Sequence, residues 1–184
     1  MPEQHYAHRE RVQLSEESEI LKLYALVDGI QYDRFFDEPL EEAAGVRSLF
    51  SLPEDKVLAC AGPWLLDESD LSQEHLTKIR QLERNYPAVS WLISEQPFFT
   101  LARHFESSLR VSLPSKETGL FRFYDCRVLK MLPELLSSQQ MTHLMKYAVR
   151  WIFLYEGKVS GYQIDRESLS VSMLRSYAEN KEKS

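Results

Sequence analysis

The sequence predicts an α/β fold, a mixed β-sheet flanked by helices with a helical and hairpin C-terminal part. Three observations predict it. A long apolar run early in the chain indicates a buried strand. Strand patterns then alternate with amphipathic helix patterns. Later, pairs of extended segments around polar turns indicate hairpins, so crossover and hairpin connections are both expected in one sheet.

The 184 residues are enough for one compact domain with a proper core. Residues 1–18 show little periodicity and are expected to form a flexible N-terminal arm. Residues 19–165 are predicted to form a single α/β domain, and residues 166–184 a C-terminal helix followed by a solvated tail. No internal repeat or linker composition argues for a second domain.

Glycine and proline residues mark the ends of the first predicted strand and helix. The apolar run from Ile20 to Val27 predicts a buried strand that ends at Asp28-Gly29. A short helix is expected from Pro39 to Ala44, because proline stands near its start and Gly45 just past its end.

The middle of the chain alternates strands and helices. Trp64 to Leu66 predicts a strand, and Ser72 is a plausible N-cap for a helix through Arg84. Val89 to Ile93 predicts the next strand, and Pro97 opens a helix with an apolar stripe. The buried side of the first of these helices is predicted to carry Leu76, Ile79 and Leu82.

The last third combines hairpins and short helices. Extended segments are expected over residues 110–113 and 120–124, around a polar loop, and two short helices between residues 128 and 145 with Ser137 or Ser138 as a cap. Residues 151–155 and 159–164 predict a second hairpin around Glu156-Gly157. Asp165 is a plausible cap for a helix through Tyr177, since Leu169, Met173 and Tyr177 recur at four-residue spacing.

One stretch concentrates charge where a predicted strand meets a helix. We call Arg122, Tyr124, Asp125 and Arg127 the charged junction. Asp125 stands at the expected helix N-cap, and the two guanidinium groups flank its carboxylate. Such a group could bind an anionic partner through charge-assisted contacts or form a structural ion pair, and the structural ion pair is favoured.

Composition excludes several classes. The formal charge of −6 and the lack of a basic cluster argue against nucleic-acid partners. Cys60 and Cys126 form no CxxC motif, and His5 and His8 have no nearby cysteine or acidic cluster to complete a site, so no metal or other cofactor is predicted. The polar N-terminus does not resemble a signal peptide, and no apolar run approaches the roughly 20 residues that span a bilayer, so we expect a soluble, cytoplasmic protein without membrane insertion.

Catalytic motifs are likewise missing. Six glycines provide no Walker loop, dinucleotide fingerprint or nucleophile elbow. A small hydrolase remains the enzymatic alternative, with an active centre that would act on an acyl or phosphoryl substrate through Arg103, His104, Arg122, Asp125 and Arg127. A boundary histidine on an amphipathic helix is nevertheless usually structural. Ser94, His104 and Asp125 contain the residue types of a triad, but nothing in the sequence indicates that they converge.

Aromatic residues make up 11 % of the chain, and large rings are common anchors at protein interfaces. Most are expected in the core. Residues on polar-flanked edges or near the C-terminus are the better candidates for contacting a partner: Tyr124, Arg150, Trp151, Tyr155, Met173 and Tyr177.

A set of short motifs, taken in order, resembles a known family, the adaptor chaperones of type VI secretion effectors. The motifs together cover about residues 20–155, and none is diagnostic alone. In sequence order they are Leu23-Tyr24-Ala25-Leu26-Val27-Asp28-Gly29, Ser48-Leu49-Phe50, Gly62-Pro63-Trp64-Leu65, Trp91-Leu92-Ile93-Ser94, Leu101-Ala102-Arg103-His104-Phe105, the stretch Phe121 to Leu129, and Trp151.

The resemblance implies a cytoplasmic adaptor that holds a secreted effector and helps deliver it to the valine-glycine repeat (VgrG) spike protein. It implies no catalytic role. Cys126 departs from the proline that usually follows the aspartate in the family, which is expected to loosen the start of this helix without changing the fold. A toxin-neutralising immunity-like protein is a third alternative.

Overall fold

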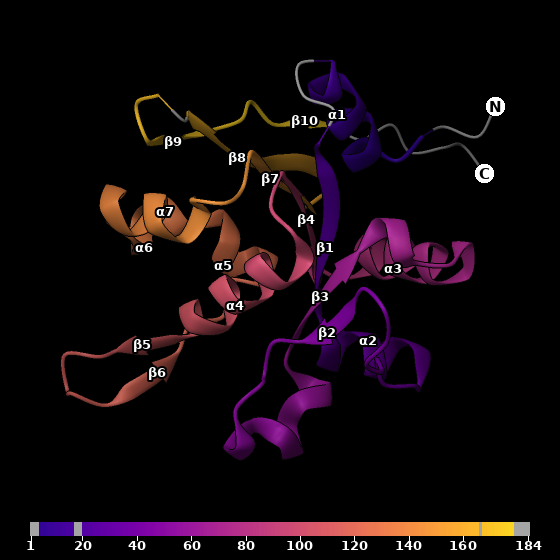
Figure 1. The fold of residues 1–184 in the computed structure, drawn as a ribbon, viewed down its shortest axis with the longest axis vertical. Helices are drawn as coiled ribbons and strands as arrows, with labels where there is room; N and C mark the ends of the chain where they lie inside the picture. Colours follow the sequence, from indigo (N-terminus) through magenta and orange to yellow (C-terminus); the bar gives the residue numbers. More distant parts are fainter. Residues whose placement is uncertain (1–3, 17–19, 166, 179–184) are drawn as a thin grey trace.

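The computed structural model describes residues 4–16, 20–165 and 167–178. Its centre is a sheet with the strand order β10-β8-β7-β4-β1-β3-β2, in which β9 also pairs with β8. A separate two-stranded ribbon, β5–β6, extends from the body (Figure 1). The strands are β1 (Lys22–Asp28), β2 (Val46–Ser48), β3 (Pro63–Asp67), β4 (Val89–Ser94), β5 (Arg110–Ser112), β6 (Thr118–Leu120), β7 (Arg150–Tyr155), β8 (Lys158–Asp165), β9 (Ser170–Met173) and β10 (Tyr177–Ala178).

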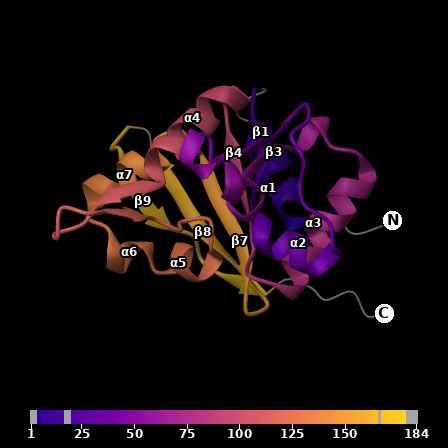
Figure 2. The same cartoon turned by 90° about the horizontal axis from the view of Figure 1, so that it is seen from below.

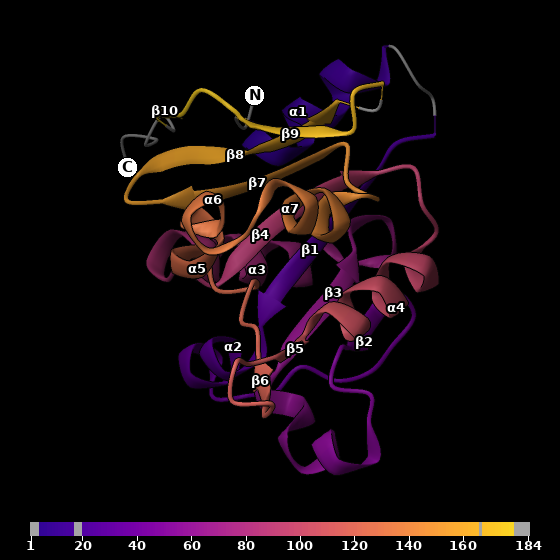
Figure 3. The same cartoon turned by 90° about the vertical axis from the view of Figure 1, so that its left-hand side faces the viewer.

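Helices cover both faces of this sheet. Figures 1 and 2 show α4 to α7 on one side and α2 and α3 on the other, and Figure 3 views the sheet from the α4–α7 side. The α-helices are α1 (Tyr6–Ser15), α2 (Gly29–Phe36), α3 (Gln73–Asn85), α4 (Phe98–Ser108), α5 (Cys126–Lys130), α6 (Leu132–Leu135) and α7 (Ser138–Met145). Two 3₁₀ helices are η1 (Pro53–Ala61) and η2 (Glu68–Asp70).

The central strand divides two hydrophobic cores. Successive side chains of a strand point to opposite faces, so Tyr24 and Leu26 of β1 pack with α4–α7. Leu23, Ala25 and Val27 pack with α1, α2 and α3 instead. This double burial explains why β1 is apolar almost throughout. The α/β class with flanking helices is confirmed.

The sheet differs from expectation in its strand directions. Each pairing between described strands of the main sheet is antiparallel. Strands β3 and β4 are connected through α3, and both run antiparallel to β1, which lies between them. They are therefore parallel to each other without being neighbours, so the crossover creates no parallel pair.

Several local predictions are confirmed. Ser72 caps α3 by accepting from the His75 amide, and Leu76, Ile79 and Leu82 are buried. Ser137 and Gln140 form a capping box at the start of α7. The β7–β8 hairpin turns at Glu156 (φ 50°) and Gly157 (φ 73°), and two successive positive φ angles are typical of a type I′ turn.

The N-terminal arm prediction is wrong for residues 5–16. They form α1 and its caps, with Tyr6 and Ala7 fully buried, because the His5 ring caps the helix and Glu83 binds both His5 and Tyr6. Residues 1–3 and 17–18 of the expected arm lie outside the described part.

Two further helix predictions are wrong. Residues 39–44 have irregular backbone, and Ala43 bridges to Val46 around Gly45 at φ 66°, so this glycine forms a tight turn and ends no helix. The predicted C-terminal helix is replaced by β9 and β10, which both extend the edge of β8. The predicted tail, residues 179–184, lies outside the described part of the chain.

Candidate functional site

The charged junction lies where β1 ends and α5 begins. Two buried aspartates each cap a helix: Asp28 accepts from the Ile30 amide at the start of α2, and Asp125 accepts from the Arg127 amide at 2.9 Å at the start of α5. The N-cap role predicted for Asp125 is confirmed. Asp28 joins this group from a distant part of the sequence.

Both arginines pair with these carboxylates. Arg127 binds Asp125 in a bidentate manner, with Nε 3.0 Å from Oδ1 and Nη2 2.7 Å from Oδ2. Arg122 places Nη2 3.4 Å from Oδ2 of Asp28 and lies over the ring of Tyr124. The carboxylates are buried while the guanidinium groups remain largely exposed. The structure therefore brings the four predicted junction residues together as an ion-pair network that closes over two helix caps.

The two carboxyl groups differ in their electrostatics. Burial raises the pKa of Asp28, and the nearby Arg122 offsets only part of this effect. Burial also raises the pKa of Asp125, but the hydrogen bonds from the Arg127 side chain and amide outweigh it, so the net shift is downward. Asp125 is thus held ionised, with both oxygens bound to Arg127.

The strand predicted over residues 120–124 is wrong beyond Leu120. There β6 ends, the Phe121 amide donates to the Leu109 carbonyl, and residues 123–125 form a turn. Phe123 and Tyr124 are both buried in this turn, so the predicted division into a core face and an amphipathic face is not seen.

The three side chains of the considered triad have separate partners. His104 Nε2 lies 2.8 Å from the Leu144 carbonyl, and because a carbonyl only accepts, this nitrogen carries the proton. Burial lowers the pKa of His104. Ser94 donates to the Tyr147 carbonyl, and Asp125 is held by Arg127. The structure does not assemble these residues into a catalytic triad.

The partner-contact candidates fall into two groups. Trp151 and Tyr124 are buried, so the prediction that they form an interaction surface is wrong. Trp151 packs against Phe105 and Phe123 and donates to Ser90 Oγ, because β7 lies inside the sheet. Arg150 forms an ion pair with Glu10, which fastens α1 to β7.

The other candidates remain predictions. Tyr155 is half-buried beneath the Lys130 ammonium, 4.6 Å from its ring centroid. Tyr177 is 39 % exposed and donates to Glu10 Oε1. Met173 is 58 % exposed and lies beside a groove that sequence reasoning did not locate.

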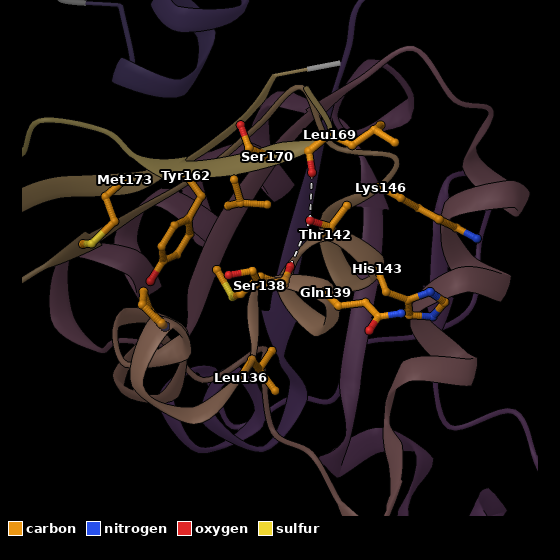
Figure 4. Close-up of a pocket in the computed structure, with 13 residues that line it drawn as sticks. Leu136, Ser138, Gln139, Thr142, His143, Lys146, Tyr162, Leu169, Ser170 and Met173 are labelled. Carbon is orange, nitrogen blue, oxygen red and sulfur yellow. Dashed lines mark hydrogen bonds between the residues drawn. The ribbon is translucent and has the colours of Figure 1, made fainter. Parts of the chain in front are cut away.

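This hollow, which we call the α7–β9 groove, lies between α6–α7 and the strands β8 and β9 and has a volume of about 810 Å³. Figure 4 shows Met173 and Tyr162 on its strand side and Ser138 and Thr142 on its helix side. Thr142 donates to the Leu169 carbonyl at 3.0 Å and so ties the turn before β9 to α7. Leu169 is itself 64 % exposed.

A buried polar cluster was also missed. Glu83 of α3 accepts from Trp91 Nε1 at 2.9 Å and from the Tyr6 hydroxyl, and its second oxygen lies 2.7 Å from His5 Nε2. Its partners lie 8 to 78 residues away in the sequence, so no local motif marks the cluster. It joins α1 to the domain.

Cys126 stands at the first position of α5, where the resembled family has proline. Its amide donates to the Pro87 carbonyl at 3.1 Å and its thiol donates to the Val89 carbonyl at 3.2 Å. Burial raises the pKa of this thiol, which keeps it protonated as a donor. The helix start therefore has two anchors that a proline would lack.

We expect Cys126→Pro to lower the free energy of unfolding by about 1–3 kcal/mol. The substitution removes two buried donors, the amide and the thiol of Cys126, and leaves the Pro87 carbonyl without its hydrogen bond. Asp125 already has φ −79° and ψ 119°, a conformation compatible with a following proline. Denaturant unfolding measures the change, and Cys126→Ala, which keeps the amide, should cost less. Equal or greater stability of the proline variant would show that the amide bond contributes nothing.

The described residues contain neither a metal-binding cluster nor a membrane-spanning helix. Within residues 4–16, 20–165 and 167–178, no group of three or more His, Cys, Asp or Glu side chains is placed to hold a metal ion. In the same residues, none of the helices has the length and apolar character needed to cross a bilayer.

Comparison with known proteins gives one assignment. Neither the curated proteins nor the solved structures include a match to this chain. A family model described as "Domain of unknown function (DUF4123)" matches residues 23–143, which contain all but the first residue of β1, the elements from α2 to α6, most of α7 and the whole charged junction. The match covers well over half of the chain, and the protein therefore belongs to the DUF4123 family.

Proposed function

We propose that this protein is a cytoplasmic adaptor chaperone that binds a type VI secretion effector and assists its loading onto the VgrG spike protein. Membership of the DUF4123 family, together with the ordered motifs from Leu23 to Trp151, supports the proposal. The role requires a surface on which a polypeptide can be held and from which it can be released.

The observation that carries this proposal is the α7–β9 groove. It combines an open hollow of about 810 Å³ with exposed apolar side chains, Leu169 and Met173, at the edge of a sheet. Exposed apolar surface beside polar groups is typical of protein–protein contact sites. The groove thus supplies what an adaptor needs.

The hydrolase alternative has less support. A general base needs a free atom aimed at substrate, whereas both Asp125 oxygens bind Arg127 and His104 Nε2 is directed at the Leu144 carbonyl. We therefore propose binding in place of catalysis. A hydrolase would lose turnover on His104→Ala while keeping its fold; an adaptor has no turnover to lose.

Co-expression with the protein encoded immediately beside this chain tests the proposal. We expect a stable complex on affinity purification and sizing, and we expect the neighbouring protein to be insoluble or unstable when expressed alone. An adaptor covers surface that its cargo otherwise exposes, which explains both results. Secretion of the neighbouring protein should also require this chain.

Two results would contradict the adaptor role. If this chain elutes alone and its neighbour is soluble without it, the proposal loses its main support. If the two proteins bind and toxicity is neutralised, but secretion proceeds without this chain, the immunity-like alternative is correct.

A further inference from the structure

We propose that an extended segment of a partner polypeptide adds to the sheet beside β9 and places alternate side chains in the α7–β9 groove. This inference deepens the adaptor proposal and rests on it only for the identity of the partner as cargo. The binding mode itself follows from the register of β9, the groove beneath it and the charges around it.

The register leaves part of the β9 backbone directed outward. Leu174 faces Gly161 on β8, and its amide donates to the Gly161 carbonyl at 2.8 Å, so these two residues form a hydrogen-bonded pair. In an antiparallel ladder such pairs alternate with pairs that make no bonds to each other. Val171, opposite Ile164, and Met173, opposite Tyr162, are pairs of the second kind.

The amide and carbonyl groups of Val171 and Met173 consequently point away from β8. Among the described strands, β8 is the sole neighbour of β9, so no described strand forms hydrogen bonds with these outward groups. Outward-pointing backbone groups at a sheet edge form a template for an added strand. Strand addition of this kind provides affinity through main-chain bonds.

The same two residues face the groove. Directly paired residues of neighbouring strands point to the same face, so Met173 shares the face of buried Tyr162, whose hydroxyl donates to the Leu129 carbonyl on α5. Val171 and Met173 both line the groove. Ser172 lies between them in sequence and therefore on the opposite face. Alternate residues of an added strand would enter the same hollow.

Charge indicates what kind of segment fits. Among the residues that line the groove, Lys146 carries a positive charge and His143 contributes an imidazole, both exposed on α7 or just after it, and no lining residue is acidic. Glu95 lines a smaller adjoining hollow that shares Lys146. The groove is thus locally basic on a chain with a formal charge of −6. We infer that its occupant alternates apolar residues and carries acidic residues beside α7.

The same charges disfavour a second copy as the occupant. Pairing of β9 with β9 would bring two basic grooves together, without an acidic strand to neutralise either. A partner segment of the stated composition meets no such repulsion. The experiment below separates these two occupants.

The test selects random displayed peptides on the isolated 184-residue chain and measures the affinity of the enriched peptides by fluorescence anisotropy. We expect alternating apolar peptides with acidic residues. Met173→Pro should weaken their binding by about tenfold or more, because it removes an outward donor without breaking a β8–β9 bond. Ser172→Arg, which adds bulk on the opposite face, is the matched control and should bind as the wild type.

Several outcomes would overturn the inference: no enriched peptide, peptides that bind Met173→Pro as well as wild type, or a dimer of this chain that Met173→Pro disperses. If Met173→Pro fails to fold by circular dichroism, Val171→Glu decides, because it fills the groove with a side chain that repels acidic peptides and leaves the backbone intact. Unchanged peptide binding would then refute the docking site. A co-expressed complex that survives these variants would retain the adaptor role and reject this site. Peptide binding without a co-expressed complex would retain this site and reject the adaptor role.

Discussion

We expect Glu83→Ala to lower the free energy of unfolding by about 3–5 kcal/mol, because it leaves three buried donors without their shared acceptor, at about 1–3 kcal/mol for each unsatisfied group. Glu83 is 5 % exposed and serves His5, Tyr6 and Trp91 at once. Its loss leaves their polar groups in the core without this acceptor, and each unsatisfied group is costly. Denaturant unfolding measures the change.

The structure also predicts where the loss appears first. Two of the three groups bound to Glu83 lie at the start of α1, so amide exchange in Tyr6–Ser15 should accelerate more than in β1. Glu74→Ala is the matched control on the same helix, because Glu74 is exposed and pairs only with Lys78 among the described ion pairs. If the two variants have equal stability, the buried cluster does not hold α1 in place.

How far the sequence predicts this fold depends on whether the signal is local. The run of β1, the capped helix α3 and the β7–β8 turn each lie within a short window, and all three were predicted. The burial of α1 depends instead on Glu83, far along the chain. Its residues show no clear apolar stripe, so periodicity could not reveal the helix.

Two periodic patterns overlap in residues 169–177. Leu169, Met173 and Tyr177 suggested a helix by their four-residue spacing, but Ser170 to Met173 alternates polar and apolar residues, which is the strand pattern. The segment forms a strand and not a helix because the edge of β8 is available to pair with it. Weighing both periods over the same window would have indicated β9.

The candidate sites divide in the same way. The Asp125 cap and its pairing with Arg127 lie within a few residues and were predictable. The pairing of Arg122 with Asp28 spans 94 residues, and the α7–β9 groove exists only once β9 has paired with β8 beside α7. A single sequence contains no observation that places those segments together.

Trp151→Ala should lower the free energy of unfolding by about 3–5 kcal/mol, and its effect on partner binding should follow only from that loss. Trp151 is fully buried, its ring lies 5.4 Å from that of Phe105 and 5.9 Å from that of Phe123, and its indole donates to Ser90 Oγ. Truncation leaves a large cavity and an unpaired hydroxyl beside it.

Met173→Ala is the matched control, because Met173 was also predicted to contact a partner but is largely exposed. Denaturant unfolding measures the stability of both variants, and partner binding is then measured under conditions where each is fully folded. The two measurements together distinguish a residue of the core from a residue of the binding surface. We expect Trp151→Ala to be destabilised with near-normal binding, and Met173→Ala to be stable with weakened binding. The contrary result is a Trp151→Ala protein of normal stability that no longer binds its partner. It would place Trp151 at the interface. Because the indole is buried and β7 lies inside the sheet, this result would also require β7 to be uncovered in the complex.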